Sequence, residues 1–409
     1  MGIVYSRTGT PAPALQGQSP SLADKWLFRL ASGIRTGTLT LTLPNGEMKT
    51  FTGTVPGPAA DFIIHSWRAI RRLFTGGDIG FAEGYIDADW STSDLNALLE
   101  LIARNDEAIE FKVEGTRFRR IIDRVYHLLR ANTRRGSRRN IQAHYDLGNA
   151  FYREWLDPTM TYSSGIYDCP NDPLERAQLR KYRRMAEMIG AKPGQHILEI
   201  GCGWGGFSAY LAEQHGCRVT GITLSNAQHD FATEQIARKG LNGRVDIRIE
   251  DYRDVAGKYD GIASIEMFEA VGENNWPHFF AGLRNRLADH GRAALQVITI
   301  HENRFDSYRI KADFIQRYVF PGGMLPSVEA FRENARLGGL DLKDAFFFGQ
   351  SYAQTLGEWQ SRFTGAWPEI RRHGFDERFR RLWEYYLAYC QAGFRSGAID
   401  VGQFVLQKA

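Results

Sequence analysis

The part of this chain best suited to chemistry is a glycine-rich turn within HILEIGCGWGGFSAYL, residues 196–211. A short apolar run leads into Glu199, and Gly201, Gly203 and Gly205 follow at alternate positions before a helical pattern begins. Glycines suit such a turn because the backbone bends sharply and must come close to a ligand. The spacing E-x-G-x-G-x-G between a strand and a helix favours S-adenosylmethionine over a dinucleotide, because no pyrophosphate has to be held. A purely structural turn is the alternative.

The residues expected to hold the rest of such a cofactor are less typical. Many folds of this kind carry an acidic residue after the second strand for the ribose hydroxyls, but this chain has GITLSNAQ there. Thr223 and Gln228 would then serve through neutral hydrogen bonds. Asp251 and Tyr252, in EDYRD after the third strand, are suitably placed for the edge and the face of an adenine ring. A solvated loop is the competing interpretation of that segment.

Alternating strands and helices from about residue 145 onward are expected to position these residues. Short apolar strands in HILEIG, CRVTGITL, VDIRIE, YDGIASI and AALQVITI are separated by helical stretches, which is typical of a parallel, doubly wound sheet. We therefore expect an α/β, Rossmann-like domain over residues 145–409, with VGQFVLQKA as its last strand. Residues 1–20 are predicted to be a flexible tail, and residues 21–110 a small α+β domain with a hairpin in GTLTLTLPNGEMKTF.

A basic segment, residues 111–144, connects these two domains. Its apolar residues recur at helical spacing with arginines between them. Arg134, Arg135, Arg138 and Arg139 repel one another unless an anion or carboxylates face them. An anionic membrane surface would satisfy them, at about 1 kcal/mol for each basic residue near the surface. A solvated helix packed on the core has about equal weight, and nucleic acid is disfavoured by a net charge of only +4.

Composition indicates a globular protein that would have to meet any lipid from the aqueous side. Hydrophobic residues make up 43% of the chain and charged residues 24%, values ordinary for soluble domains. The first residues lack a charged leader followed by an apolar stretch, and no apolar run approaches the roughly 20 residues needed to cross a bilayer. The four cysteines have no metal-ligand spacing, so we expect no metal site and a cytoplasmic location. If the protein acts on lipid, we expect it to bind peripherally to the inner face of the cell membrane.

Several segments together resemble the cyclopropane-fatty-acyl-phospholipid synthase family: AHYDLGNAFYREWLDPTMTYSSGIYD, LEIGCGWGGFSAYLAE, GITLSNAQ, SIEMFEAVGE, YVFPGGMLPS and AWPEI. The similarity runs from about residue 80 to the C-terminus. It implies an S-adenosylmethionine-dependent methyltransferase, an N-terminal lipid-engaging domain, unsaturated acyl chains of membrane phospholipid as substrate, and a homodimer. By matching motif positions, the resemblance implies that the following residues line the cofactor: Tyr162, Ser163, Gly201, Gly203, Thr223, Gln228, Tyr252 and Ile265.

The resemblance also implies how a proton is removed. In ring-forming members of the family a bound bicarbonate is the base, held by a Cys, a Glu, a His, an Ile and a Tyr. The matching positions in this chain are Ser164, Glu269, Gln296, Ile298 and Tyr352. The change from Cys to Ser is mild if the backbone amide does the binding. The change from His to Gln is not mild, because Gln can neither carry charge nor shuttle a proton.

Glu266 is a second departure, because ring-forming relatives commonly have Gly at this position. Glu266 and Glu269 are three residues apart and are predicted to share one face of a helical turn. Two carboxylates so close would raise one pKa and repel bicarbonate, so that a carboxylate side chain would become the base. We therefore predict a non-cyclising methyltransferase that leaves a methyl- or methylene-branched unsaturated chain, such as a furan precursor.

Three other functions stay open at this point. Glu266 could cap a loop or face water while bicarbonate still binds, which would leave a cyclopropane synthase. Small-molecule N-methyltransferases share this catalytic fold, although the N-terminal domain argues against that function. A non-catalytic lipid-binding protein is disfavoured by the intact glycine motif and by Glu269 and Tyr352.

Overall fold

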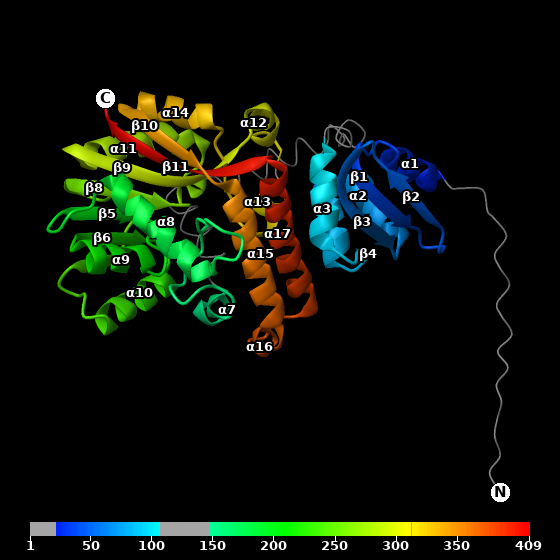
Figure 1. Cartoon of the computed structure of the whole chain (residues 1–409), viewed down its shortest axis with the longest axis horizontal. Helices are drawn as coiled ribbons and strands as arrows, with labels where there is room; N and C mark the ends of the chain where they lie inside the picture. The colour runs from blue at the N-terminus through cyan, green and yellow to red at the C-terminus, as the bar shows by residue number, and fades with distance from the viewer. Residues whose placement is uncertain (1–21, 107–146, 312) are drawn as a thin grey trace, which may run out of the picture.

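The computed structural model describes residues 22–106, 147–311 and 313–409, which form an N-terminal unit and a larger catalytic unit packed against each other (Figure 1). The expected tail, residues 1–20, and the expected connector, residues 111–144, lie outside the described residues. The last residues of the chain form a strand of the large sheet, as predicted for VGQFVLQKA.

The N-terminal unit is a four-stranded sheet with three helices. Its elements are α1 (Leu22–Ala31), β1 (Thr36–Thr42), β2 (Met48–Thr52), β3 (Val55–Ile64), α2 (Trp67–Ile86), β4 (Trp90–Ser91) and α3 (Leu95–Arg104). The strand order is β2-β1-β3-β4. The antiparallel pair β1–β2 confirms the predicted hairpin. Alternate residues of β1 are buried, so Leu39 and Leu41 point into the core of this unit.

The catalytic unit alternates strands and helices, as the sequence predicted. Its first half comprises α7 (Asn149–Arg153), α8 (Leu174–Ile189), β5 (His196–Ile200), α9 (Gly206–His215), β6 (Arg218–Thr223), α10 (Asn226–Arg238), β7 (Val245–Ile249) and β8 (Tyr259–Ile265). Its second half comprises η1 (Phe268–Ala270), η2 (Glu273–Asn275), α11 (Trp276–Arg286), β9 (Leu287–Ile300), α12 (Glu302–Tyr308), α13 (Phe314–Tyr318), α14 (Val328–Leu337), β10 (Leu340–Phe347), α15 (Gly349–Gly365), α16 (Trp367–Arg372), α17 (Glu377–Ser396) and β11 (Ile399–Lys408).

The seven strands of this unit form one sheet in the order β10-β11-β9-β8-β5-β6-β7. Strands β9, β8, β5, β6 and β7 run parallel, and β11 and β10 are added antiparallel at one edge. Strand β5 is buried over Ile197–Ile200 because helices cover both faces of the sheet. This arrangement is the predicted Rossmann-like, doubly wound fold, in which ligands bind beyond the carboxyl ends of the parallel strands.

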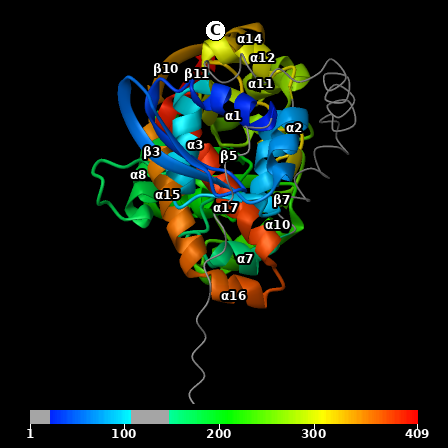
Figure 2. The same ribbon diagram turned by 90° about the vertical axis from the view of Figure 1, so that its right-hand side faces the viewer.

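Helices α15 and α17 stand between the large sheet and the N-terminal unit, and α3 lies along α17 (Figures 1 and 2). Polar contacts cross this junction. The Arg381 Nε donates to the carbonyl oxygen of Tyr85 at 2.5 Å, and the Arg395 Nη1 pairs with the Glu100 Oε2 at 3.2 Å. The two units therefore share a packed interface, and both contribute to the cavity described below.

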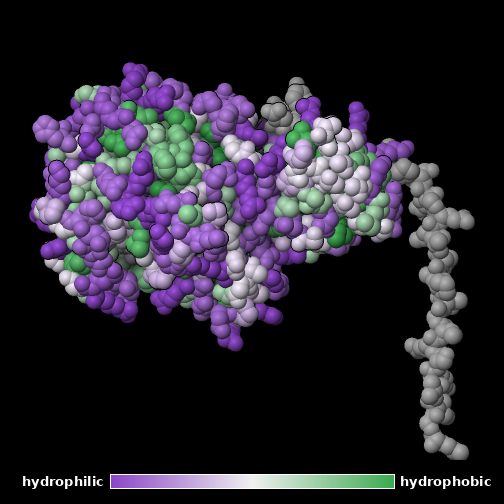
Figure 3. All heavy atoms as spheres, viewed as in Figure 1, coloured by the Kyte–Doolittle hydropathy of each residue, from purple (hydrophilic) through white to green (hydrophobic). Residues whose placement is uncertain are grey.

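Hydrophilic side chains dominate the face of the catalytic unit seen in Figure 3, with smaller apolar areas between them. Within residues 22–106, 147–311 and 313–409, no helix is both long enough and apolar enough to cross a membrane.

Candidate active site

A cavity of about 670 Å³ extends from the carboxyl ends of β5, β6 and β8 into the N-terminal unit. Its catalytic end is lined by the glycine turn, by carboxylates and by aromatic rings. Its other end is lined by apolar side chains of the N-terminal unit, among them Leu39, Leu41, Phe62, Leu98 and Leu101. A polar cofactor and a long apolar chain could therefore occupy one continuous space.

The glycine turn adopts backbone conformations that few other residues tolerate. Gly201, Gly203 and Gly205 have φ values of 80°, 53° and 83°. A Cβ atom on Gly201 would lie 2.7 Å from the Met267 Cγ, whereas one on Gly203 would meet nothing within 4 Å. Gly201 and Gly203 line the cavity, and this turn leaves the room that S-adenosylmethionine would need. Gly205 is not among the lining residues; it caps α9 and packs close to Ala232.

Glu199 is a functional candidate that the sequence analysis used only as part of the motif. Its carboxylate lies in the cavity wall at the end of β5 and is 3% exposed. Burial raises its pKa to about 8, although the Ser208 hydroxyl donates a hydrogen bond to it. The position of Glu at the start of E-x-G-x-G-x-G was the signal that could have identified it.

The residues predicted to bind the ribose and adenine separate into two groups. Thr223, Gln228 and Tyr252 line the cavity, and the Thr223 hydroxyl donates to the Gln228 Oε1 at 2.7 Å. Asp251 is not among the lining residues. Its carboxylate instead receives two hydrogen bonds from the Arg253 guanidinium, at 2.8 and 2.6 Å. The preceding residue, Glu250, lines the cavity in its place.

Residues 161–165, here called the strap, are part of the connection between α7 and α8, and the first three of them line the cavity. Tyr162 and Ser163 line the cavity as predicted, and the Tyr162 and Tyr386 hydroxyls lie 2.7 Å apart. Two side chains of α8 hold the strap. The Gln178 Nε2 donates to the Ser163 carbonyl oxygen at 2.8 Å, and the Lys181 Nζ donates to the Ser163 Oγ at 2.7 Å. Sequence analysis had not singled out either side chain.

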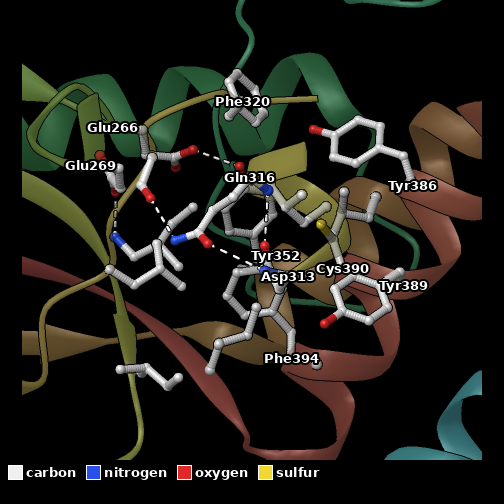
Figure 4. Close-up of a pocket in the computed structure, with 18 of the residues that line it drawn as sticks. Glu266, Glu269, Asp313, Gln316, Phe320, Tyr352, Tyr386, Tyr389, Cys390 and Phe394 are labelled. Atoms are coloured by element: carbon white, nitrogen blue, oxygen red, sulfur yellow. Dashed lines mark hydrogen bonds between the residues drawn. The ribbon is translucent and has the colours of Figure 1, made fainter. Parts of the chain in front are cut away.

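Glu266 follows β8 directly and presents its carboxylate to three donors from three other segments. Figure 4 shows its side chain beside Glu269 in the wall of the cavity. Its Oε1 accepts from the Ser164 backbone N–H at 2.9 Å and from the Gln296 Nε2 at 2.7 Å. Its Oε2 accepts from the Tyr352 hydroxyl at 2.5 Å. The Gln403 Nε2 donates to the Gln296 Oε1 at 3.0 Å, which fixes the direction of the Gln296 amide. We call the three donors to Glu266, which are the Ser164 N–H, the Gln296 Nε2 and the Tyr352 hydroxyl, the carboxylate cradle.

The backbone at Glu266 differs from the predicted helical turn. Its φ of 52° lies in the left-handed region, and helix η1 begins only at Phe268. Glu266 and Glu269 therefore do not share a helix face, and the sequence-based reason for their proximity was wrong. Their charges nevertheless interact, because both side chains line the same enclosed cavity. A left-handed conformation for a residue with a side chain costs on the order of 1 kcal/mol, and the surrounding bonds maintain it.

Glu269 has one satisfied and one free oxygen. Its Oε1 accepts from the Ile298 backbone N–H at 2.6 Å. Its Oε2 is buried without a hydrogen-bond partner among the described residues. Burial, and then the negative charge of Glu266, raise the pKa of Glu269 to about 8. Burial also raises the pKa of Glu266, but the hydrogen bonds from Tyr352 and the other donors oppose this shift. The hydrogen bonds therefore favour the charge of the pair on Glu266, and the raised pKa of Glu269 favours the proton there.

Aromatic rings form much of the remaining wall of the catalytic end. The Tyr352 ring stacks on Phe394 with 4.4 Å between ring centroids. Other lining rings are those of Tyr308, Phe320, Tyr385, Tyr386 and Tyr389, several of which are visible in Figure 4. Ring faces attract cations, so this wall suits a reaction that develops positive charge on an apolar substrate. In the described part of the chain, no group of three or more His, Cys, Asp or Glu side chains could hold a metal ion.

Sequence comparison finds relatives along almost the whole chain. The family model described as mycolic acid cyclopropane synthetase matches residues 132–404. The chain is 37% identical to the tuberculostearic acid methyltransferase UfaA1 of Mycobacterium tuberculosis, over 97% of this chain and 93% of that protein. It is 33% identical to the cyclopropane-fatty-acyl-phospholipid synthase of Escherichia coli, over 85% of this chain and 88% of that protein.

Structure comparison also finds similarity to a cyclopropane synthase, over a part of the chain the size of the catalytic unit. The crystal structure of the mycolic acid cyclopropane synthase CmaA1, complexed with SAH and CTAB, superposes with a TM-score of 0.62 and 30% sequence identity. The match covers 66% of this chain and 98% of that chain. Because the chain is also similar in sequence to proteins named for different products, the comparisons leave the choice of product to the geometry of the site.

Proposed function

This chain belongs to the mycolic acid cyclopropane synthetase family, and on that basis we propose that it methylates an alkene carbon in an unsaturated acyl chain of membrane phospholipid. Proteins of this kind use S-adenosylmethionine to methylate or cyclopropanate fatty acyl chains, and this chain is such an enzyme. The proposed product is a methyl- or methylene-branched unsaturated chain rather than a ring. Glu266 is the proposed base.

The observation that supports a branched product is the occupancy of the carboxylate cradle. In ring-forming relatives, by the resemblance drawn above, bicarbonate is held at positions that match Ser164, Gln296 and Tyr352. In this chain the same three residues donate hydrogen bonds to the Glu266 carboxylate. A second anion in that place would meet a buried carboxylate at contact distance, which is strongly unfavourable. The side chain therefore takes the place of bicarbonate as the base.

The residues that line the cavity have different roles in the proposed reaction. S-adenosylmethionine supplies an electrophilic methyl group. The apolar lining excludes water and aligns the acyl chain, because an alkene is a weak nucleophile that reacts only when well oriented. The π electrons of the alkene form the new carbon–carbon bond to the methyl group, which leaves a carbocation on the neighbouring chain carbon. Tyr352 and the other aromatic side chains of the wall stabilise that cation.

The fate of one proton then decides the product. Loss from a chain carbon beside the cation gives a methyl-branched alkene. A 1,2-hydride shift followed by loss from the new methyl group gives a methylene branch, and loss from that methyl group without the shift closes a cyclopropane. In the proposed reaction the C–H electrons form the new double bond and the proton passes to Glu266. Glu269, with a pKa of about 8, remains protonated and adds no second negative charge.

The N-terminal unit supports the choice of a lipid substrate. Its core residues extend the cavity with apolar side chains, enough to accept an acyl chain that reaches beyond the reacting carbons. The proposal has four further parts. The acyl chain comes from a phospholipid bilayer, the protein is peripheral on the inner face of the cell membrane, its partner there is an anionic membrane surface, and it is a homodimer. The phospholipid substrate and the homodimer rest on the family resemblance, and the anionic membrane surface rests on Arg134, Arg135, Arg138 and Arg139.

Proton NMR of the methylated lipid tests the proposal. The protein is incubated with labelled S-adenosylmethionine and phospholipids of mixed unsaturation, and the released acyl chains are analysed. Vinylidene or shifted alkene signals are expected. Upfield cyclopropane signals would refute the branched product. Mass alone does not decide, because the ring and the methylene product each add one carbon and two hydrogens.

A further inference from the structure

Lys181 is a buried cation to which the proposed reaction gives no role. It lies in the middle of α8, and its side chain has 0% exposure. Burying a charged ammonium group costs several kcal/mol unless opposite charges and hydrogen bonds compensate for it. Its Nζ donates to the Ser163 Oγ at 2.7 Å, directly beside the residue whose backbone N–H binds Glu266.

Three carboxylates face Lys181 from three other segments. Glu266 follows β8, Asp157 precedes the strap and Glu199 lies within β5, and each attracts the ammonium group. Burial lowers the pKa of Lys181 to about 8, and these attractions oppose the shift. Lys181 therefore remains protonated at neutral pH. Its own helix adds the ring of Tyr182, whose centroid lies 4.8 Å from the Nζ.

The charges around Glu266 show why this cation matters. The other groups that face Glu266 are the Ser164 N–H, Gln296, the Tyr352 hydroxyl and the Glu269 carboxyl. None of these carries a positive charge. Burial raises the pKa of the Glu266 carboxyl group, the hydrogen bonds from these donors lower it, and attraction to Lys181 lowers it further.

We propose that Lys181 is a positioning residue for the reaction, whose ammonium group holds the strap against Glu266 and keeps the Glu266 carboxylate ionised. The inference rests on the proposed role of Glu266 as the base. The hydrogen bond to Ser163 fixes the strap, and thereby the direction of the adjacent Ser164 N–H. The charge acts across the low-dielectric interior, where Coulomb attraction is much stronger than in water.

The pH dependence of kcat/KM for the lipid tests the electrostatic part. In Lys181→Met the cation is lost with little change in volume, so the pKa of Glu266 rises. The acidic limb of the profile is then expected to move to higher pH. Lys192→Met is the matched control, because the same change at an exposed position is screened by solvent and should leave the limb in place. A slower Lys181→Met enzyme with an unshifted limb would refute the inference, since a merely structural residue lowers the rate without moving the limb.

A double-mutant cycle in thermal stability provides a readout that needs no turnover. Without Lys181, the buried Glu266 charge loses a compensating partner. Adding Glu266→Gln to Lys181→Met is therefore expected to recover several degrees of Tm, or to restore folded protein if the single variant does not fold. No recovery would overturn the inference. Normal turnover by Glu266→Gln alone would instead refute the proposed function, while the coupling between the two residues would still report on Lys181.

Discussion

Replacing Glu266 by Gly should turn this enzyme into one that depends on added bicarbonate. The substitution removes the carboxylate but leaves its three donors: the Ser164 N–H, the Gln296 Nε2 and the Tyr352 hydroxyl. An oxyanion of carboxylate size can then enter the cradle and accept the same hydrogen bonds. Because the φ at this position is 52°, Gly also relieves the backbone, by about 1 kcal/mol.

The expected magnitudes follow from these contacts. Loss of a positioned base lowers kcat by about 10²- to 10⁴-fold. Three donors left without an acceptor would each cost about 1–3 kcal/mol if dry, but Glu266 lines the cavity, so removal of its side chain lets water from the cavity reach them. The variant should therefore fold, with the backbone gain offsetting part of the loss. Bicarbonate at millimolar concentration should restore about tenfold or more of the lost rate, although not all of it, because Gln296 supplies no charge or proton.

The assay measures transfer of label from S-adenosylmethionine to phospholipid in buffer freed of carbon dioxide, with and without bicarbonate. Glu266→Gln is the control, because its amide fills the cradle, excludes bicarbonate and cannot act as a base. The wild type should be indifferent to bicarbonate, Glu266→Gly should respond, and Glu266→Gln should stay inactive with unchanged cofactor affinity. A wild-type rate that falls without bicarbonate and returns on its addition would refute the reasoning, as would normal turnover by Glu266→Gln.

Three further changes probe the rest of the site. Tyr352→Phe removes one donor to the Glu266 carboxylate, so the pKa of that carboxyl should rise and the acidic limb of kcat/KM should move upward; an unshifted limb would contradict this. Between about pH 4.5 and 8, Glu269 binds more protons in the folded than in the unfolded protein, so the stability it contributes is present below that window and is lost as pH rises through 8. In thermal melts, Glu269→Gln should therefore lose less Tm than the wild type between pH 5 and 8.5. Parallel losses of Tm would argue against the raised pKa. Gly201→Ala brings a Cβ within 2.7 Å of a neighbouring side chain at the cofactor end, so calorimetry should show at least about tenfold weaker S-adenosylmethionine binding. Gly190 also has a positive φ, but a Cβ there meets nothing within 4 Å, so Gly190→Ala should bind the cofactor normally.

Local patterns in the sequence were enough to predict the frame of the site. The glycine spacing at residues 201–205 was interpreted correctly as a turn between a strand and a helix, because its positive φ values are a local property of glycine. The alternation of apolar strands with helices predicted the parallel sheet, since strands buried on both faces must be continuously apolar. The changes at Gln296 and Glu266 were also visible in the sequence, once the family positions were matched.

The placement of charges was decided by the tertiary structure. The predicted contact of Asp251 with adenine stays a prediction, but the bond of its carboxylate to Arg253 was not foreseen, because a spacing rule does not include side-chain partners. Lys181 and Glu199 were not recognised as site residues. A lysine in a helical pattern usually faces solvent, and only the packing of α8 against the strap shows that this one is buried.

The chain's own sequence determined that it has a class I methyltransferase frame, a glycine turn for S-adenosylmethionine and an extra carboxylate near the expected base. Only the tertiary structure decided where that carboxylate lies. Ser164, Gln296 and Tyr352 come from segments more than fifty residues apart, yet their donors converge on Glu266. Local sequence patterns depend on backbone preferences and side-chain periodicity. Convergence depends on how the strap, β9 and α15 pack around a single buried charge, and that packing is a property of the whole fold.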